Sequence, residues 1–122
     1  MTGGDAGVRV AAVDLGATSG RVMAGTVTPA TLRLEEGHRF PNGGVRAGGA
    51  LYWDVLGIHR EMLVGIAEVA GTGRLDGIGI DSWAVDYGLL DRDGQLLGNP
   101  YSHRDARTDG VMAQALEQVG AD

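Results

Sequence analysis

The residues best suited to chemistry lie in a short polar segment near the amino end of the chain. An apolar run ends on Asp14, a Gly-rich segment with Thr18 and Ser19 follows, and a second apolar run begins at Val22. This pattern predicts a strand, a tight turn and a second strand. Such a turn offers backbone N–H groups and hydroxyls to a phosphate, with the Asp14 carboxylate beside them to hold Mg²⁺. It is not a P-loop, which opens a helix and carries a lysine, because this chain has no lysine.

Two residues of this segment have alternative roles. Asp14 also suits the cap of a tight turn. Turn geometry alone does not require the hydroxyls of Thr18 and Ser19, so their presence favours an anion site. Arg21 can bind a phosphate through its guanidinium, or it can be surface charge on a strand.

A second candidate site is the segment Asp81-Ser-Trp-Ala-Val-Asp86. Asp81 ends a predicted strand, so Asp14 and Asp81 come together if their two strands are neighbours. A carboxylate pair with Mg²⁺ suits phosphoryl transfer. The alternative is that both are unrelated strand-end caps. Trp83 either stacks on a ligand ring or fills the core.

The densest polar cluster is His103-Arg-Asp-Ala-Arg-Thr-Asp109. It precedes a predicted helix, so Asp105, Thr108 or Asp109 can simply cap that helix. An Asp-x-Arg pair can also lock a loop at a substrate site. The three histidines are scattered along the chain without metal-ligand spacing, and no Ser/His/Asp motif is present.

The elements that position these residues follow from hydrophobic periodicity and turn signals. Three strands with short turns predict an antiparallel meander, and the whole pattern predicts an α/β domain of order βββαβββα. Residues 1–7 are expected to be a disordered lead-in. In chain order, we expect strands at 8–13, 21–28 and 31–40, an exposed loop at 41–50, a helix from its cap Asp54 to about Ala70, strands at 75–80, 85–90 and 95–97 with a hairpin turn at 91–94, and a last helix from Thr108 or Asp109.

Composition narrows the class of protein. The 122 residues carry a net charge of −6, which argues against binding a nucleic-acid backbone. The absence of cysteine excludes a thiol nucleophile and a zinc–thiolate site. No apolar stretch approaches the roughly 20 residues of a membrane span, and residues 1–7 lack the pattern of a signal peptide. We therefore expect a soluble, cytoplasmic protein with no membrane or nucleic-acid partner.

Several stretches together resemble rhamnulokinases, a family within the FGGY carbohydrate kinases. The resemblance runs from about Val8 to Gly120. The stretches that carry the resemblance are Val13–Val22, His38–Gly43, Trp53–Val55, Gly79–Asp86 and Arg104–Thr108. Val13–Val22 resembles a motif that is shared by the wider sugar-kinase, heat-shock protein and actin superfamily. His38–Gly43 and Gly79–Asp86 are more specific to rhamnulokinases.

This resemblance implies the N-terminal part of a ribonuclease H-like, actin-like ATPase domain. It also implies an ATP- and Mg²⁺-dependent kinase that phosphorylates the small-molecule sugar L-rhamnulose on its 1-hydroxyl. Asp14 would lie near Mg²⁺ and bind it through water. Ala84 would contact the sugar, with Trp83, Asp81 and Asp105 as further candidate sugar contacts. The residues implied for the ATP phosphates are Ala17, Thr18, Ser19, Gly20 and Arg21.

The chain departs from the family pattern in two residues and in length. Ala84 stands where rhamnulokinases more usually have Gly, and His103 stands where the pattern is more often Tyr. FGGY kinases run to several hundred residues, so residues 8–122 are expected to be part of the first kinase domain. The general-base Asp is then expected beyond Asp122, and the isolated chain is expected to be inactive and to self-associate through exposed apolar faces.

Other functions fit parts of the pattern. The chain could belong to a kinase of another ketose or polyol. A non-catalytic nucleotide-binding or interaction module would keep the phosphate turn without chemistry. A ribonuclease H-like nuclease would need a third or fourth carboxylate beside Asp14 and Asp81, together with a basic surface, and the net charge of −6 counts against it.

Overall fold

The computed structural model describes residues 7–120, so all of the predicted lead-in except Gly7 lies outside the described residues. The chain divides into two compact units. Unit 1 comprises residues up to Gly43 together with Val55–Ala84, and unit 2 comprises Gly44–Asp54 together with the residues from Val85 onward.

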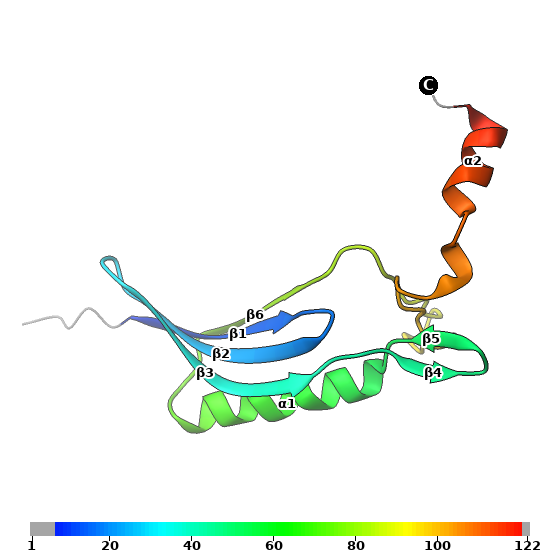
Figure 1. The fold of residues 1–122 in the computed structure, drawn as a ribbon. Helices are drawn as coiled ribbons and strands as arrows, with labels where there is room; N and C mark the ends of the chain where they lie inside the picture. Colours follow the sequence, from blue (N-terminus) through cyan, green and yellow to red (C-terminus); the bar gives the residue numbers. More distant parts are fainter. Residues whose placement is uncertain (1–6, 121–122) are drawn as a thin grey trace, which may run out of the picture. The chain divides into compact units, whose positions relative to one another are not determined.

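Unit 1 is built on a four-stranded sheet (Figure 1). Its strands are β1 (Val8–Leu15), β2 (Ser19–Val27), β3 (Leu32–Pro41) and β6 (Gly77–Ser82), in the order β3-β2-β1-β6. The first three strands pair antiparallel, which confirms the predicted meander, and β6 runs parallel to β1. The parallel pairing brings the carboxyl ends of β1 and β6 to the same edge of the sheet.

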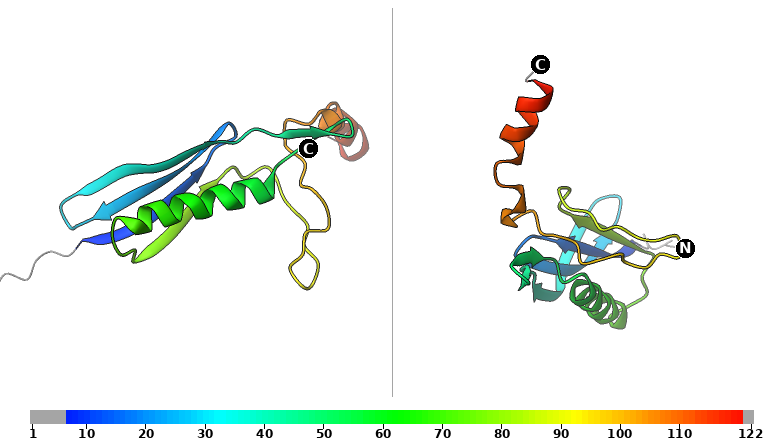
Figure 2. Two further views of the ribbon diagram at one scale, coloured as in Figure 1. Left: turned by 90° about the horizontal axis from the view of Figure 1, so that it is seen from below. Right: turned by 90° about the vertical axis from the view of Figure 1, so that its right-hand side faces the viewer.

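Helix α1 (Val55–Gly71) lies along one face of this sheet (Figure 2). Every second residue of a strand points to this face. As a result, Ala11, Val13 and Val22 form the buried core with Val69 of the helix. The helix approaches the sheet closely at Gly65, where a Cβ atom would lie 2.4 Å from Val22 Cγ2. The predicted helix ending near Ala70 is confirmed.

Strand β6 remains exposed at the edge of the sheet. Ile78 and Ile80 pair with Ala11 and Val13 of β1 and so belong to the face that α1 covers. They are nevertheless 56% and 59% exposed, because α1 packs on β1, β2 and β3. The buried apolar side chains of this face therefore lie on β1 and β2, and those of the edge strand β6 remain exposed.

Unit 2 begins with a small hairpin that corrects the predicted loop at 41–50. Strands β4 (Val45–Ala47) and β5 (Ala50–Tyr52) pair antiparallel. The Gly48-Gly49 turn joins them with φ of 57° and 84°, values that glycine adopts readily. Sequence periodicity misses this hairpin because three-residue strands are too short to show alternation.

The strands predicted at 85–90 and 95–97 are wrong. In this region the residues pair only at an isolated bridge between Leu90 and Leu96. The predicted turn is present: the Gly94 N–H donates to the Asp91 carbonyl, and Gly94 has φ of 80°. Apolar alternation is genuine in this segment, but a strand also needs a partner for its ladder, and the described chain supplies one at a single point. The observed order is consequently βββββαβα, with a short 3₁₀ helix before the last element.

Helix α2 (Val111–Val119) starts later than predicted. Asp105 caps the 3₁₀ helix η1 (Ala106–Thr108) instead of α2, and Gly110, with a left-handed φ of 78°, then separates η1 from α2. The apolar residues of α2 are exposed, which agrees with the expectation of uncovered apolar faces. Of the helices within residues 7–120, none has the length and apolar character needed to cross a membrane.

Candidate functional site

The predicted phosphate turn connects β1 to β2 in unit 1. Its backbone closes tightly, because the Gly16 N–H donates to the Ser19 carbonyl at 3.0 Å. A Cβ atom on Gly16 would lie 2.8 Å from that carbonyl, so the turn requires glycine. Thr18 is exposed, and no described residue accepts a hydrogen bond from the backbone N–H of Ala17 or Thr18. The turn thus has free donors of the kind that bind phosphate oxygens.

Asn42 holds this turn in place, a role that the sequence analysis missed. Its side-chain amide donates to the Gly16 carbonyl at 2.7 Å, and its backbone N–H donates to the Thr18 carbonyl at 2.9 Å. Asn42 is 3% exposed although it follows directly on β3. Asn42 lies within the His38–Gly43 stretch that resembles rhamnulokinases, and this resemblance is a signal of a role for Asn42. Its hydrogen-bond partners, Gly16 and Thr18, lie too far away in the sequence to be inferred.

The remaining predicted phosphate-binding residues belong to the start of β2. Ser19 is half-buried, and Gly20 is buried against the ring of Phe40, where a Cβ atom would lie 2.2 Å from Phe40 Cζ. The structure therefore explains Gly20 by packing as well as by the proposed phosphate contact. Arg21 is directly opposite Asp14 in the ladder of β1 and β2.

Asp14 lies between a cation and a second carboxylate. The Arg21 guanidinium donates to Asp14 Oδ2 through Nη2 and also through Nε, the latter at 3.2 Å. On its other side Asp14 is in register with Asp81 of β6. Directly paired residues project from the same face, and neighbouring strands lie about 4.8 Å apart. The predicted proximity of Asp14 and Asp81 is therefore confirmed.

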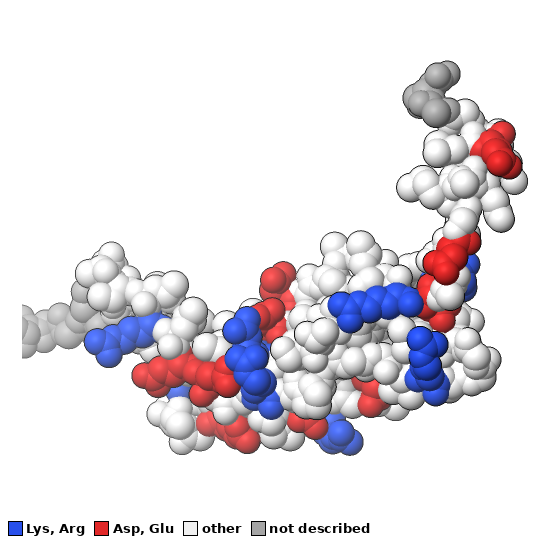
Figure 3. Space-filling view, viewed as in Figure 1, with Lys and Arg blue, Asp and Glu red and all other residues white. Residues whose placement is uncertain are grey.

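A similar ion pair lies on the next strand. Arg39 of β3 is opposite Arg21 and donates to Glu36 at 2.5 Å from Nη2. This bond lowers the pKa of Glu36 below its ordinary value, with the charge of Arg39 adding to the effect. Figure 3 shows acidic and basic side chains interleaved over the visible face. On this face no extended patch of basic side chains is visible.

The Asp14/Asp81 pair suits a magnesium ion that is also held by phosphates and water. Mg²⁺ is commonly bound through one or two carboxylates, with substrate phosphates and waters completing its coordination. Within residues 7–120 no group of three or more His, Cys, Asp or Glu side chains could hold a metal ion. The donor set therefore fits a nucleotide-bound Mg²⁺ and gives no support to a nuclease centre with further carboxylates.

The residues predicted to contact the sugar fall in both units. Asp81 and Ala84 are exposed in unit 1, and Trp83 between them is half-buried. Asp105 belongs to unit 2 and is 8% exposed. It accepts hydrogen bonds from the backbone N–H of Leu51 at 2.6 Å and of Arg107 at 2.9 Å. These two bonds, the Leu51 bond first, lower the pKa of Asp105. Its role in the described structure is to tie β5 to η1.

Asp86 is a second buried carboxylate in unit 2. Its Oδ2 accepts hydrogen bonds from Trp53 Nε1 at 2.7 Å and from His103 Nδ1 at 2.8 Å. All three residues lie in or beside the stretches that resemble rhamnulokinases, yet their positions in the sequence predict no common role for them. Their spacing of more than 15 residues leaves no local signal that they meet.

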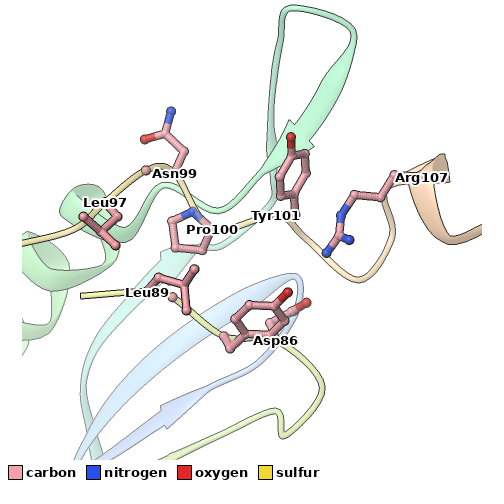
Figure 4. Close-up of a pocket in the computed structure, with 10 residues that line it drawn as sticks. Asp86, Leu89, Leu97, Asn99, Pro100, Tyr101 and Arg107 are labelled. Atoms are coloured by element: carbon pink, nitrogen blue, oxygen red, sulfur yellow. The ribbon is translucent and has the colours of Figure 1, made fainter. Parts of the chain in front are cut away.

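A small pocket also lies in unit 2, with Asp86 on its wall (Figure 4). The cavity has a volume of about 240 Å³. Its apolar lining includes Leu89, Leu97 and Pro100. The Arg107 guanidinium lies 4.4 Å from the centre of the Tyr101 ring, in a cation–π contact. All residues that line this pocket belong to unit 2.

Solved structures define the class of fold. The chain is similar to a gluconate kinase from Lactobacillus acidophilus, with a TM-score of 0.76, 14% identity, and coverage of 93% of this chain and 23% of that one. It is also similar to a xylulose kinase from the same organism, with a TM-score of 0.71, 15% identity, and coverage of 92% and 23%. The expected ribonuclease H-like, actin-like ATPase fold of sugar kinases is thereby confirmed.

Curated sequences narrow the resemblance within that class. No protein-family model matches the chain. The chain is 53% identical over 112 residues to a rhamnulokinase of Enterobacter sp. (strain 638), and the aligned region covers 89% of this chain and 23% of the relative. It is 51% identical over 114 residues to a rhamnulokinase of Pectobacterium carotovorum, with coverage of 91% and 23%. The expected homology to rhamnulokinases is confirmed, and the chain spans about a quarter of the length of these relatives.

Proposed function

We propose that this chain supplies the phosphate-binding part of an ATP- and Mg²⁺-dependent kinase that phosphorylates L-rhamnulose on its 1-hydroxyl. The observation that carries the proposal is the arrangement at one sheet edge. A tight turn with free backbone donors lies beside the Asp14/Asp81 pair and Arg21. The 53% identity to a rhamnulokinase supports the choice of sugar.

The proposed roles follow from the chemistry of each group. Backbone N–H groups at the turn and the Thr18 and Ser19 hydroxyls donate to phosphate oxygens. Arg21 exchanges part of its contact with Asp14 for a phosphate oxygen, since an exposed ion pair is weak and readily rearranged. The residues proposed for the phosphates are Ala17, Thr18, Ser19, Gly20 and Arg21.

When bound, Mg²⁺ neutralises charge on the phosphates of the nucleotide. In this chain Asp14 and Asp81 would hold it, Asp14 through a water molecule. The two carboxylates would also orient the water molecules around the ion. The proposal assigns no general base to this chain.

The sugar is proposed to contact Ala84, with Trp83, Asp81 and Asp105 as further contacts. A backbone contact at position 84 tolerates a methyl group, whereas a close side-chain contact there would not. Ala84 would therefore alter how closely the sugar fits and which ketose is preferred. Residues 8–122 are proposed to be part of the first of two kinase domains, in a cytoplasmic protein that binds neither nucleic acid nor membrane.

The test is a coupled ADP-release assay with Mg·ATP and a panel of ketoses. It uses both the 122-residue chain and the product of the complete reading frame that contains it. The 122-residue chain alone is expected to give no turnover, and the complete product is expected to give its highest kcat/KM with L-rhamnulose. Turnover of a different ketose in preference to L-rhamnulose would contradict the substrate assignment. The absence of turnover of every ketose by the complete product would contradict the assignment as a kinase.

Self-association is a separate part of the proposal. Met112 and Val119 of α2 are 75% and 80% exposed, and Ile78 and Ile80 of β6 are exposed as well. Large exposed apolar side chains favour association. Sedimentation velocity of the 122-residue chain is expected to show a concentration-dependent increase in mass, and a monomer at all concentrations would contradict this part.

A further inference from the structure

The side chain of Asp86 joins two ring nitrogens inside unit 2. It is 8% exposed, and Trp53 is 4% exposed. Asp86 Oδ2 accepts from Trp53 Nε1 at 2.7 Å and from His103 Nδ1 at 2.8 Å. The rings of Trp53 and His103 lie with centroids 5.9 Å apart at 41°. The arrangement is a buried carboxylate that fixes the orientation of two rings.

This geometry determines which nitrogen of neutral His103 carries the proton. An ionised carboxylate accepts hydrogen bonds and cannot donate. The nitrogen that faces Asp86 is Nδ1, so Nδ1 is protonated and Nε2 has a free lone pair. No described residue bonds to His103 Nε2, and the His103 side chain is 29% exposed. In its neutral form His103 therefore presents an oriented hydrogen-bond acceptor, Nε2, to its surroundings.

We propose that His103 Nε2 accepts a hydrogen bond from a hydroxyl of the sugar, and that Asp86 is the positioning residue for His103. This inference rests on the proposed function and adds a specificity-determining residue to it. A lone pair backed by a buried carboxylate selects a neutral donor such as a hydroxyl and disfavours a phosphate. His103 directly precedes the Arg104–Thr108 stretch, which supplies the proposed sugar contact Asp105, and both residues belong to unit 2.

The first test measures the tautomer directly. In the 122-residue chain labelled with ¹⁵N, histidine ring nitrogens are observed by NMR at a pH where the ring is neutral. His103 is expected in the Nδ1–H form, and Asp86→Asn, whose amide oxygen is a weaker acceptor than a carboxylate, is expected to give a mixture of both forms. A dominant Nε2–H form in the wild-type chain would overturn the inference.

The second test separates binding from folding through KM and kcat for L-rhamnulose, measured on the product of the complete reading frame. His103→Phe keeps a ring but removes the acceptor, and KM is expected to rise about tenfold with kcat nearly unchanged. His103→Gln restores an acceptor oxygen and is expected to recover most of this loss. His59→Phe, on the exposed side of α1, is the matched control and is expected to leave KM unchanged.

Asp86→Asn is expected to raise KM less than His103→Phe does. The double variant should be no weaker than His103→Phe alone, because Asp86 acts through His103. An unchanged KM in His103→Phe, with wild-type turnover intact, would overturn this inference and leave the proposed function standing. If the wild-type protein turns over no ketose, the proposed function fails, and the sugar role of His103 fails with it.

Discussion

The interior of unit 1 and the interior of unit 2 are stabilised by different kinds of interaction. In unit 1 the buried side chains are apolar: Ala11, Val13 and Val22 of the sheet pack against Val69 of α1. In unit 2 the buried groups are mostly polar, and the carboxylates of Asp86 and Asp105 each accept two hydrogen bonds. The stability contributed by apolar packing depends on how well the side chains fill the available volume. The stability contributed by a buried carboxylate depends on its charge and on the groups that donate hydrogen bonds to it.

The difference also separates the proposed roles of the acidic residues. Asp14 in unit 1 is 45% exposed and has one exposed partner, Arg21. Asp86 in unit 2 is 8% exposed and has two ring donors. A carboxylate with an exposed partner can exchange that partner for a ligand, while a buried one is better suited to orient its neighbours. We therefore assign ligand exchange to Asp14 and positioning to Asp86.

The largest expected effect is on the packing of unit 1. Gly65→Val inserts a side chain where a Cβ atom already lies 2.4 Å from Val22. We expect the free energy of unfolding, measured with urea, to fall by about 2–3 kcal/mol. Gly71→Val is the matched control, because a Cβ atom there has no neighbour within 4 Å. Equal losses in the two variants would show that tight packing at Val22 does not stabilise unit 1.

The next effect concerns Asn42, a buried polar residue of unit 1. Asn42→Ala removes the amide that donates to the Gly16 carbonyl at 2.7 Å. Because the half-buried Gly16 carbonyl then loses its partner, we expect the free energy of unfolding in urea to fall by about 2 kcal/mol. Faster hydrogen exchange should be seen at residues 16–19. Unchanged exchange in the turn would contradict the assignment of Asn42 as its anchor.

Unit 2 is expected to respond to acid through Asp105. Its pKa is lowered by the backbone N–H groups of Leu51 and Arg107. A carboxyl whose folded pKa lies below its unfolded value stabilises fully above the unfolded value, and this stabilisation is lost as pH falls through the folded pKa. Amide protection at Leu51 and Arg107 should therefore decrease at pH below the ordinary aspartate value of 3.8.

Asp105→Asn tests at neutral pH whether the Asp105 carboxylate protects the amides of Leu51 and Arg107. The amide replaces one accepting oxygen, so one of the two N–H groups loses its partner. Hydrogen exchange at Leu51 or Arg107 is expected to be about tenfold faster, with the core of unit 1 unaffected. Asp109→Asn is the exposed control. Acceleration at Val22 to the same extent would remove the distinction between the two units.

The smallest effect on stability is expected at the paired surface charges. Arg21→Gln and Arg39→Gln each break one exposed ion pair, with Asp14 and Glu36 respectively. Each should cost less than about 1 kcal/mol in urea unfolding. The two variants should differ in affinity for Mg·ATP, which falls only in Arg21→Gln. Equal loss of affinity in both would indicate a general charge effect.

Local sequence signals were sufficient for most of unit 1. Apolar runs separated by a Gly-rich turn predicted β1 and β2, and the helical stripe through Met62 and Val69 predicted α1. The sequence predicts that Asp14 and Asp81 lie close together only if their two strands are neighbours. The structure supplies this condition through the parallel pairing of β1 and β6. That pairing joins residues 67 positions apart and has no local signature.

Unit 2 was poorly predicted because few of its contacts are local. Asp105 ties Leu51 to Arg107, and Asp86 ties Trp53 to His103, so single side chains link segments that show no periodicity. The alternation of Val85, Tyr87 and Leu89 predicts a strand, yet these residues are 67%, 68% and 61% exposed. Of the three, only Leu89 bonds to a neighbouring segment among the described residues, its carbonyl accepting from the Leu97 N–H at 2.9 Å. Alternation predicts a strand only where a neighbouring strand exists.

The most direct test of the central claim is a titration of the ¹⁵N-labelled 122-residue chain with Mg·ATP, followed residue by residue by NMR. The phosphate turn is expected to respond first, with chemical-shift changes at the amides of Ala17, Thr18, Ser19 and Gly20 at millimolar nucleotide. Asp14→Asn and Arg21→Gln should weaken this response. Shift changes confined to unit 2, or an unchanged turn at saturating nucleotide, would contradict the assignment of this turn as the phosphate site.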